Sequence, residues 1–118
     1  KRVLMLEVSG PFHSSLMTSA RDKLKEYIEK MQILPPKISF ISNVDAKIQN
    51  DPSRIKENLI AQVNSKTLWE ESVKLVSQSG VKSFFEIGPG EVLKGLLKKI
   101  DPKLEVRSVG TFQDLEVL

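Results

Sequence analysis

His13 is the only histidine among the 118 residues, and it is the candidate for acid–base chemistry. It follows an apolar run and a Ser9-Gly10-Pro11 turn, and it comes just before a helical pattern. Loops at the carboxyl ends of strands are where α/β folds place reacting groups. A neutral imidazole at such a place can act as a general base, and the alternative is a histidine that is structural or simply exposed.

A general base needs a nucleophile, and the sequence offers no convincing one. Nucleophilic acyl transfer typically uses a serine on a tight strand-to-helix turn of the form G-x-S-x-G. No two of the six glycines bracket a serine in that way. Ser14 and Ser15 adjoin His13, and we expect one of them to cap the helix that follows.

Two further features sit where strands end. Gly88-Pro89-Gly90 follows an apolar run and is either a cradle for phosphate or a forced turn between strand and helix. Proline removes one backbone donor, which favours the turn. Asn43 follows another short run, where it can hold a polar group in place or form an Asx-type turn.

Composition excludes several classes of site. The chain has no cysteine, so disulfides, thiolate catalysis and cysteine-based zinc sites are excluded, and we expect no metal and no bound cofactor. The net charge of +3 is spread along the chain without aromatic interleaving, which argues against nucleic acid. The basic residues form either solvated helix faces or a surface for an acidic or phosphate-bearing partner.

The chain has no apolar run long enough to span a bilayer and no signal-peptide pattern. We therefore expect a cytoplasmic protein that does not enter a membrane. Because the first residue is not methionine, we also expect a piece of a longer chain.

The elements that must position these residues alternate between short apolar strands and amphipathic helices. The patterns predict strands at residues 2–8, 38–42, 81–87 and 104–109, and helices at 14–31, 52–63, 67–79 and 91–100. Asp51-Pro52 is a helix start, and Thr111 begins a last short helix. Such alternation is typical of an α/β fold with a mostly parallel sheet and flanking helices.

Four stretches resemble the malonyl-CoA:acyl carrier protein transacylases in order and spacing, so that the resemblance covers essentially the whole chain. They are VSGPFHSSLM at 8–17, ISNVDA at 41–46, Gln62 with WEESV at 69–73, and FEIGPGEVLKGL at 85–96. One departure is local, since the family often has Tyr-Asn-Pro where this chain has Asn64-Ser65-Lys66.

The resemblance implies an acyltransferase that moves malonyl from coenzyme A to acyl carrier protein through an acyl-serine intermediate, in fatty acid biosynthesis. It implies that His13 is the base, that the Gln62 main-chain carbonyl orients it, and that Asn43 supports the local hydrogen bonds. Gly88, Pro89, Gly90 and Val92 match a loop at the active-site cleft, where substrate binds.

The resemblance also implies an α/β-hydrolase-like large subdomain, to which residues 9–118 belong, and an inserted ferredoxin-like subdomain that ends at residues 1–8. The family's nucleophilic serine, oxyanion glutamine and malonyl-binding arginine match no residue here. We therefore expect this chain to be a C-terminal portion that needs the N-terminal part as a partner and is inactive alone. Alternatives are a polyketide synthase acyltransferase segment and a non-catalytic module that binds acyl carrier protein.

Overall fold

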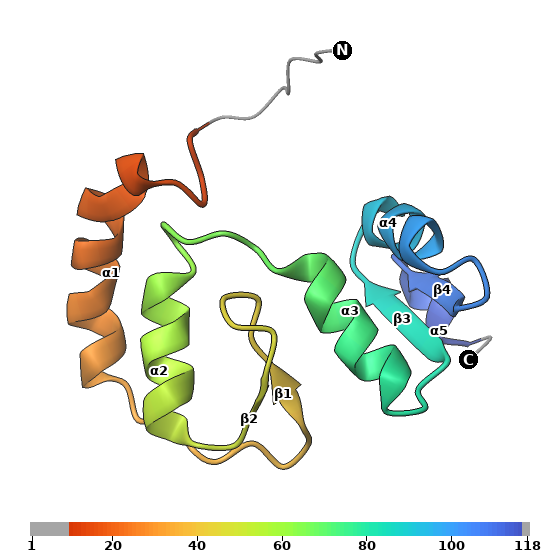
Figure 1. Cartoon of the computed structure of the whole chain (residues 1–118), viewed down its shortest axis with the longest axis horizontal. Helices are drawn as coiled ribbons and strands as arrows, with labels where there is room; N and C mark the ends of the chain where they lie inside the picture. Colours follow the sequence, from red (N-terminus) through yellow and green to blue (C-terminus); the bar gives the residue numbers. More distant parts are fainter. Residues whose placement is uncertain (1–9, 117–118) are drawn as a thin grey trace. The chain divides into compact units, whose positions relative to one another are not determined.

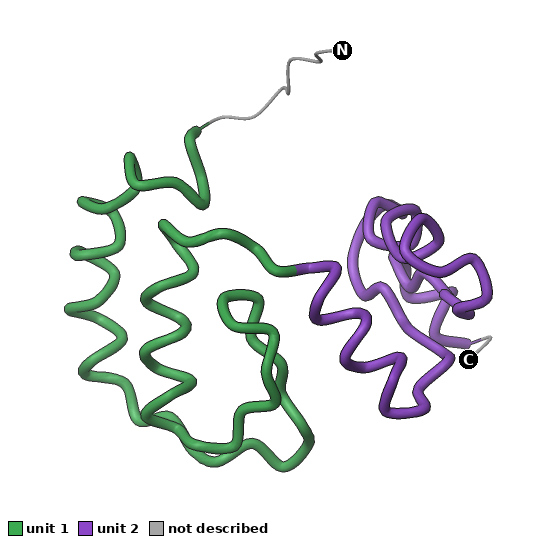
Figure 2. Tube along the Cα trace, in the orientation of Figure 1, with its two compact units in different colours: residues 1–68 green, residues 69–118 purple. Residues whose placement is uncertain are grey.

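The structure, a computed structural model, describes residues 10–116. The predicted strand at 2–8 and the predicted subdomain segment at 1–8 lie outside the described residues. The chain divides into two compact units, residues 1–68 and residues 69–118, which are coloured separately in Figure 2. Each unit is described by itself.

Two helices lie side by side in the first unit (Figure 1). A 3₁₀ turn η1 (Ser15–Met17) leads into α1 (Thr18–Lys30), and α2 (Pro52–Ala61) packs against α1. The predicted start of α2 is confirmed, because Asp51 Oδ1 accepts a hydrogen bond of 2.9 Å from the Ser53 N–H and proline occupies the first turn. Each helix buries one isoleucine, Ile28 on α1 and Ile55 on α2.

A small hairpin completes the first unit. Strand β1 (Phe40–Ile41) lies within the strand predicted at 38–42 and pairs antiparallel with β2 (Ile48–Gln49). The sequence patterns did not predict β2. A connection this short can only join antiparallel strands, so the prediction of a mostly parallel sheet is wrong for this pair. Asp45 supports the turn, because its carboxylate accepts hydrogen bonds from the Lys47 N–H and from the side-chain amide of Gln49.

The second unit contains the parallel pair that the sequence predicts. Helix α3 (Trp69–Gln78) precedes β3 (Ser83–Ile87), and α4 (Val92–Ile100) connects β3 to β4 (Glu105–Val109). The two strands are parallel, and α5 (Phe112–Leu115) follows β4. The chain is therefore a mixed α/β protein with one parallel and one antiparallel strand pair among its described residues.

The core of the second unit is formed by Val73, Leu97 and Leu104, which are 4%, 3% and 2% exposed. They come from α3, from α4 and from the segment before β4, and the side chains packed against them are Trp69, Phe84, Ile100 and Val106. Residues of α3, of α4 and of the two strands thus pack together in one core.

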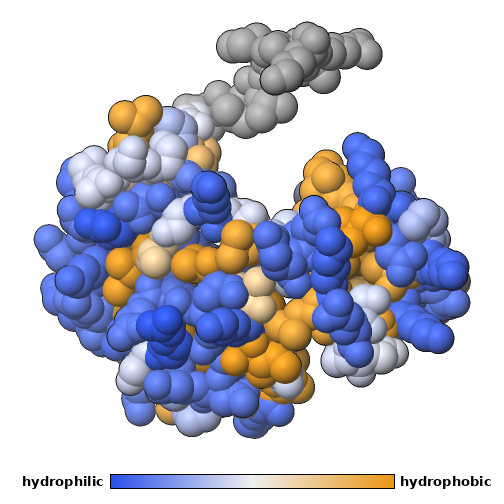
Figure 3. Space-filling view, in the orientation of Figure 1, coloured by the Kyte–Doolittle hydropathy of each residue, from blue (hydrophilic) through white to orange (hydrophobic). Residues whose placement is uncertain are grey.

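One burial prediction for α4 is wrong. The helical pattern of residues 91–100 predicts a buried side made of Val92, Leu93, Leu96, Leu97 and Ile100. Val92, Leu93 and Leu96 are instead 73%, 39% and 38% exposed. A two-stranded sheet and one neighbouring helix are too small to cover the whole apolar stripe, so only Leu97 is buried. Figure 3 shows hydrophobic residues at the surface in both units.

No helix within residues 10–116 is long and apolar enough to cross a membrane.

Asp114 fixes the start of α5 and gives a test by pH. Its Oδ2 accepts hydrogen bonds from Thr111 Oγ1, the Thr111 N–H and the Gly110 N–H at 2.9, 2.8 and 2.9 Å. These bonds, the one from the Thr111 hydroxyl first, lower the pKa of Asp114 below its ordinary value of 3.8. The stabilisation is therefore present above pH 3.8 and is lost as the pH falls through the lowered pKa.

We expect an NMR titration of the Asp114 carboxyl carbon to give a midpoint below 3.8, and Thr111→Val to move that midpoint upward. Thr67→Val, in the other unit, is the control. An Asp114 midpoint that does not respond to Thr111→Val would show that the cap does not form.

Candidate functional site

The His13 ring is held by the chain that leaves α2. His13 Nδ1 lies 2.8 Å from the main-chain carbonyl oxygen of Gln62, the residue that follows the last residue of α2. Because a carbonyl oxygen only accepts, Nδ1 must carry the proton and donate it. The other ring nitrogen, Nε2, is then unprotonated in the neutral ring and can accept a proton.

The backbone at His13 is held by the same segment. The His13 N–H donates a hydrogen bond of 3.1 Å to the Val63 carbonyl, next to the carbonyl that holds the ring. Nearby, Asn64 Nδ2 and Thr18 Oγ1 are 3.4 Å apart, which adds a weaker link to α1. Two successive carbonyls therefore fix both the main chain and the side chain of an exposed histidine.

His13 also has an unusual conformation. Its φ of 60° lies in the left-handed region, which residues other than glycine seldom adopt. The sequence patterns gave no sign of this conformation, although histidine is among the residues that tolerate it best.

The prediction that Ser14 or Ser15 caps the following helix with its side chain is wrong, because neither η1 nor α1 has a side-chain capping bond at its N-cap. Ser14 stands at the N-cap position of η1, but its hydroxyl makes no capping bond. It donates instead to the Pro11 carbonyl, at 2.6 Å, because the turn at His13 brings that carbonyl within its reach.

Asn43 lies in the turn that follows β1, in the same unit as His13 and Gln62. Its side chain is exposed, and its main-chain carbonyl accepts a hydrogen bond of 2.7 Å from the Leu68 N–H. The structure thus brings His13 and Gln62 into contact, whereas the contact it gives for Asn43 leads to the end of the unit. The role of Asn43 stays a prediction.

The predicted cleft loop belongs to the second unit. Gly88 and Gly90 have φ of 129° and 91°, which glycine adopts without strain, so the sharp turn between β3 and α4 requires these residues. The Gly88 N–H donates 3.0 Å to the Val109 carbonyl, which ties the loop to the end of β4. Pro89 and Val92 are exposed, and Val92 begins α4.

Glu86 fills the helix end that a phosphate would need. It lies on β3, and its two carboxylate oxygens accept hydrogen bonds of 2.9 and 2.8 Å from the Leu93 and Lys94 N–H groups. These are first-turn amides of α4, the groups that bind anions at helix N-termini. The geometry therefore favours the turn over the phosphate cradle for Gly88-Pro89-Gly90.

We expect Glu86→Ala to weaken the first turn of α4 by about 1–2 kcal/mol, as for the loss of a helix cap. Amide hydrogen exchange of the 118-residue chain should then become faster at Leu93 and Lys94. Glu86→Gln keeps one carbonyl oxygen, so its exchange rates at Leu93 and Lys94 should fall between those of the parent chain and those of Glu86→Ala. Unchanged exchange at Leu93 in Glu86→Ala would show that the carboxylate does not hold this turn.

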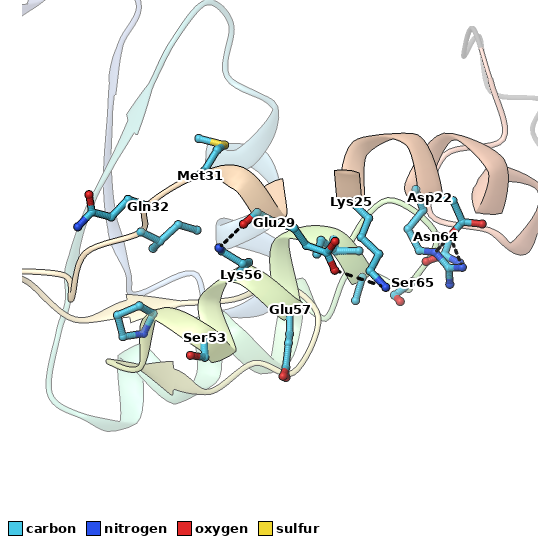
Figure 4. Close-up of a pocket in the computed structure, with 15 residues that line it drawn as sticks. Asp22, Lys25, Glu29, Met31, Gln32, Ser53, Lys56, Glu57, Asn64 and Ser65 are labelled. Carbon is cyan, nitrogen blue, oxygen red and sulfur yellow. Dashed lines mark hydrogen bonds and ion pairs between the residues drawn. The ribbon is translucent and has the colours of Figure 1, made fainter. Parts of the chain in front are cut away.

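A cavity of about 930 Å³ lies in the first unit, between α1 and α2, and none of the predicted site residues lines it (Figure 4). Its charged groups are already partnered. Lys25 pairs with the Glu29 carboxylate at 3.5 Å, and Lys56 Nζ donates to the Glu29 main-chain carbonyl at 3.0 Å. Because these lysines are engaged by the protein itself, the cavity gives no evidence of a charged ligand.

No group of three or more histidine, cysteine, aspartate or glutamate side chains that could hold a metal ion occurs in the described part of the chain.

No family model matches the chain. A curated relative, the malonyl CoA-acyl carrier protein transacylase of Bacillus subtilis (strain 168), is 44% identical over 117 residues, which are 99% of this chain and 37% of the relative. The chain thus spans well under half the length of that protein.

Solved structures agree. The acyl-carrier-protein S-malonyltransferase of Burkholderia pseudomallei 1710b matches with a TM-score of 0.90 and 43% identity, over 99% of this chain and 38% of the solved chain. A malonyl-transacylase solved in complex with a type II polyketide synthase acyl carrier protein matches with a TM-score of 0.91 and 37% identity, over the same shares of the two chains. Over nearly its whole length, in sequence and in structure, the chain corresponds to the C-terminal portion of the malonyl-CoA:acyl carrier protein transacylases.

Proposed function

We propose that this chain supplies the general base of a malonyl-CoA:acyl carrier protein transacylase, acting in fatty acid biosynthesis in the cytoplasm. The observation that carries the proposal is the hydrogen bond of 2.8 Å between His13 Nδ1 and the Gln62 carbonyl. It leaves Nε2 free to accept a proton. Over 99% of its own length, the chain that carries this histidine is 44% identical to a transacylase.

In the proposed reaction, His13 Nε2 takes the proton from a serine hydroxyl as the serine oxygen attacks the thioester carbonyl of malonyl-CoA. The carbon–sulfur bond breaks, and coenzyme A leaves as a thiol that has received the proton from the imidazolium. In the second half, His13 takes the proton from the phosphopantetheine thiol of acyl carrier protein. The sulfur attacks the acyl-serine ester, and the serine oxygen recovers its proton.

Gln62 has a positioning task in this scheme. Its carbonyl fixes the tautomer and the direction of the ring, as the aspartate does in a Ser-His-Asp triad. A neutral carbonyl stabilises the positive charge that develops on the ring less than a carboxylate would. The scheme uses no metal or cofactor, because proton transfer and acyl transfer account for every bond that changes.

We propose the remaining candidate residues as parts of the surroundings. Asn43 would support hydrogen bonds near the reacting groups, and Gly88, Pro89, Gly90 and Val92 would line the cleft that takes substrate. Asn43 follows β1 and the glycine loop follows β3, and ends of strands are common positions for ligand-binding residues in α/β folds.

The serine, the oxyanion glutamine and the malonyl-binding arginine would come from another part of the protein. That part would correspond to the rest of the relatives' length, which this chain does not cover. That part would complete an α/β-hydrolase-like large subdomain with its ferredoxin-like insert. Exposed apolar side chains support this, since Phe85, Ile87 and Val92 are 52%, 73% and 73% exposed. The chain alone would then be inactive.

The acyl carrier protein of a polyketide pathway is a second candidate acceptor. One of the matching structures is a transacylase in complex with a type II polyketide synthase carrier protein. The chemistry at His13 would be the same for either carrier, so the two functions differ only in the acceptor surface.

The test is a chimera, the Bacillus subtilis relative in which the matching 37% is replaced by this chain. We expect the chimera to transfer labelled malonyl from malonyl-CoA to the carrier protein, and the isolated 118 residues to transfer none. A folded chimera without transfer, or activity of the isolated chain, would contradict the proposal. Salt-sensitive binding of the carrier protein without transfer would instead favour a non-catalytic binding module.

A further inference from the structure

The turn that carries His13 holds the residue in a conformation that it would not adopt unaided. With a φ of 60°, His13 lies in the left-handed region, which is sparsely populated for residues with a side chain. Conformations of this kind persist only when the surrounding structure imposes them.

Two hydrogen bonds bracket the residue. On one side, the His13 N–H donates a hydrogen bond of 3.1 Å to the Val63 carbonyl. On the other side, the Ser14 hydroxyl donates a hydrogen bond of 2.6 Å back across the turn to the Pro11 carbonyl. The hydroxyl bond closes a loop from residue 11 to residue 14 with His13 inside it. Since Ser14 makes no capping bond, this is what its hydroxyl does.

The ring contact depends on this backbone conformation. The direction of the Cα–Cβ bond follows from φ, so a relaxed His13 with negative φ would point its imidazole elsewhere. Nδ1 would then leave the Gln62 carbonyl, which lies 2.8 Å away in the closed turn. The hydroxyl of residue 14 and the tautomer of residue 13 are therefore physically linked.

We infer that Ser14 is a positioning residue for His13: its hydroxyl closes the turn that keeps Nδ1–H on the Gln62 carbonyl and Nε2 free. The inference rests on the proposed function only for its catalytic consequence. The geometric part stands on the hydrogen bonds alone.

The experiment uses nitrogen-15 NMR of the imidazole in the 118-residue chain, where a single histidine gives one unambiguous pair of signals. At a pH where the ring is neutral, we expect Nδ1–H to be the major tautomer. Ser14→Ala should lose that majority, so that Nε2–H predominates as in an unrestrained histidine. Ser14→Thr keeps the hydroxyl and should keep the tautomer of the parent chain.

Ser15→Ala is the matched control, because exposed Ser15 contributes only its main-chain carbonyl to the neighbouring bonds, as acceptor from the Thr18 N–H and from Thr18 Oγ1. If Ser14→Ala does not fold, Ser14→Cys gives the same test, since a thiol fills similar space and donates weakly. An unchanged tautomer when the hydroxyl is removed overturns the inference, as does an equal change in Ser15→Ala.

The catalytic consequence is measured separately in the chimera. Ser14→Ala should lower kcat about tenfold to a hundredfold with little change in KM, since a displaced base loses its reacting geometry. Ser15→Ala should leave both unchanged. An altered tautomer in the chain with an inactive parent chimera would refute the proposed function and leave the positioning role intact. An active chimera with an unchanged tautomer would do the reverse.

Discussion

Replacing His13 with asparagine is expected to reduce malonyl transfer by the chimera by about 10²–10⁴-fold, the range for the loss of a general base. Asparagine tolerates the left-handed conformation that His13 adopts, and its amide can still donate to the Gln62 carbonyl. The substitution therefore keeps the contacts of the turn and removes only the nitrogen that accepts a proton. The decrease should appear in kcat, measured by the appearance of malonyl on the carrier protein.

His13→Ala is the companion variant, which loses the base and the contact together. Because alanine is less tolerant of positive φ than asparagine, it should disturb the turn in addition. Its kcat should be no higher than that of His13→Asn. If His13→Asn instead transfers malonyl at the parent rate in a folded chimera, His13 is not the base and the proposed mechanism is wrong.

The second large effect is expected in the core of the second unit. Leu97→Ala should lower the free energy of unfolding of the 118-residue chain by about 2–5 kcal/mol, the range for truncating a buried leucine. Leu97 is 3% exposed and packs with Val73 and Leu104, so its removal leaves a cavity between α3, α4 and the approach to β4. Urea unfolding followed by circular dichroism measures the change.

Leu96→Ala makes the same chemical change one position earlier on α4. Leu96 is 38% exposed, so the substitution should lower the free energy of unfolding by about 1 kcal/mol or less. Equal losses for the two leucines would mean that the packing face of α4 is not the one that the structure gives.

Local signals in the sequence predicted most of the elements. Asp51-Pro52 marks the start of α2, and Thr111 stands at the cap of α5, because capping chemistry depends on residues a few positions apart. The parallel pair β3–β4 follows from two apolar runs separated by a helical pattern. The two helix starts are decided within a few residues of the chain, and the parallel pair by the order of neighbouring elements.

Features that depend on distant residues were not predictable in this way. Strand β2 has only two residues, and it exists because the chain turns back after β1 and pairs with it. The burial of α4 depends on how much sheet is present to cover its stripe, which no local pattern contains. Glu86 caps a helix that begins six residues later, and this spacing matches no capping rule.

The candidate site divides in the same manner. His13 stands out as the only histidine, whereas its partner Gln62 is indicated by the resemblance to the transacylases and by no local pattern. The contact between them is present in the structure. The left-handed conformation and the bond from Ser14 to Pro11 arise from the turn itself, so the sequence patterns missed both. The roles of Asn43 and of Gly88, Pro89, Gly90 and Val92 stay predictions.

In the proposed mechanism, this chain provides the base for a nucleophile that lies elsewhere in the protein. The most direct test mixes the chimera with malonyl-CoA, without carrier protein, and locates the covalent malonyl group by mass spectrometry of peptides at successive times. We expect a rapid adduct on a serine of the relative's own portion, formed far more slowly in His13→Asn. An adduct on Ser14 or Ser15, or equal rates in the two proteins, would contradict it.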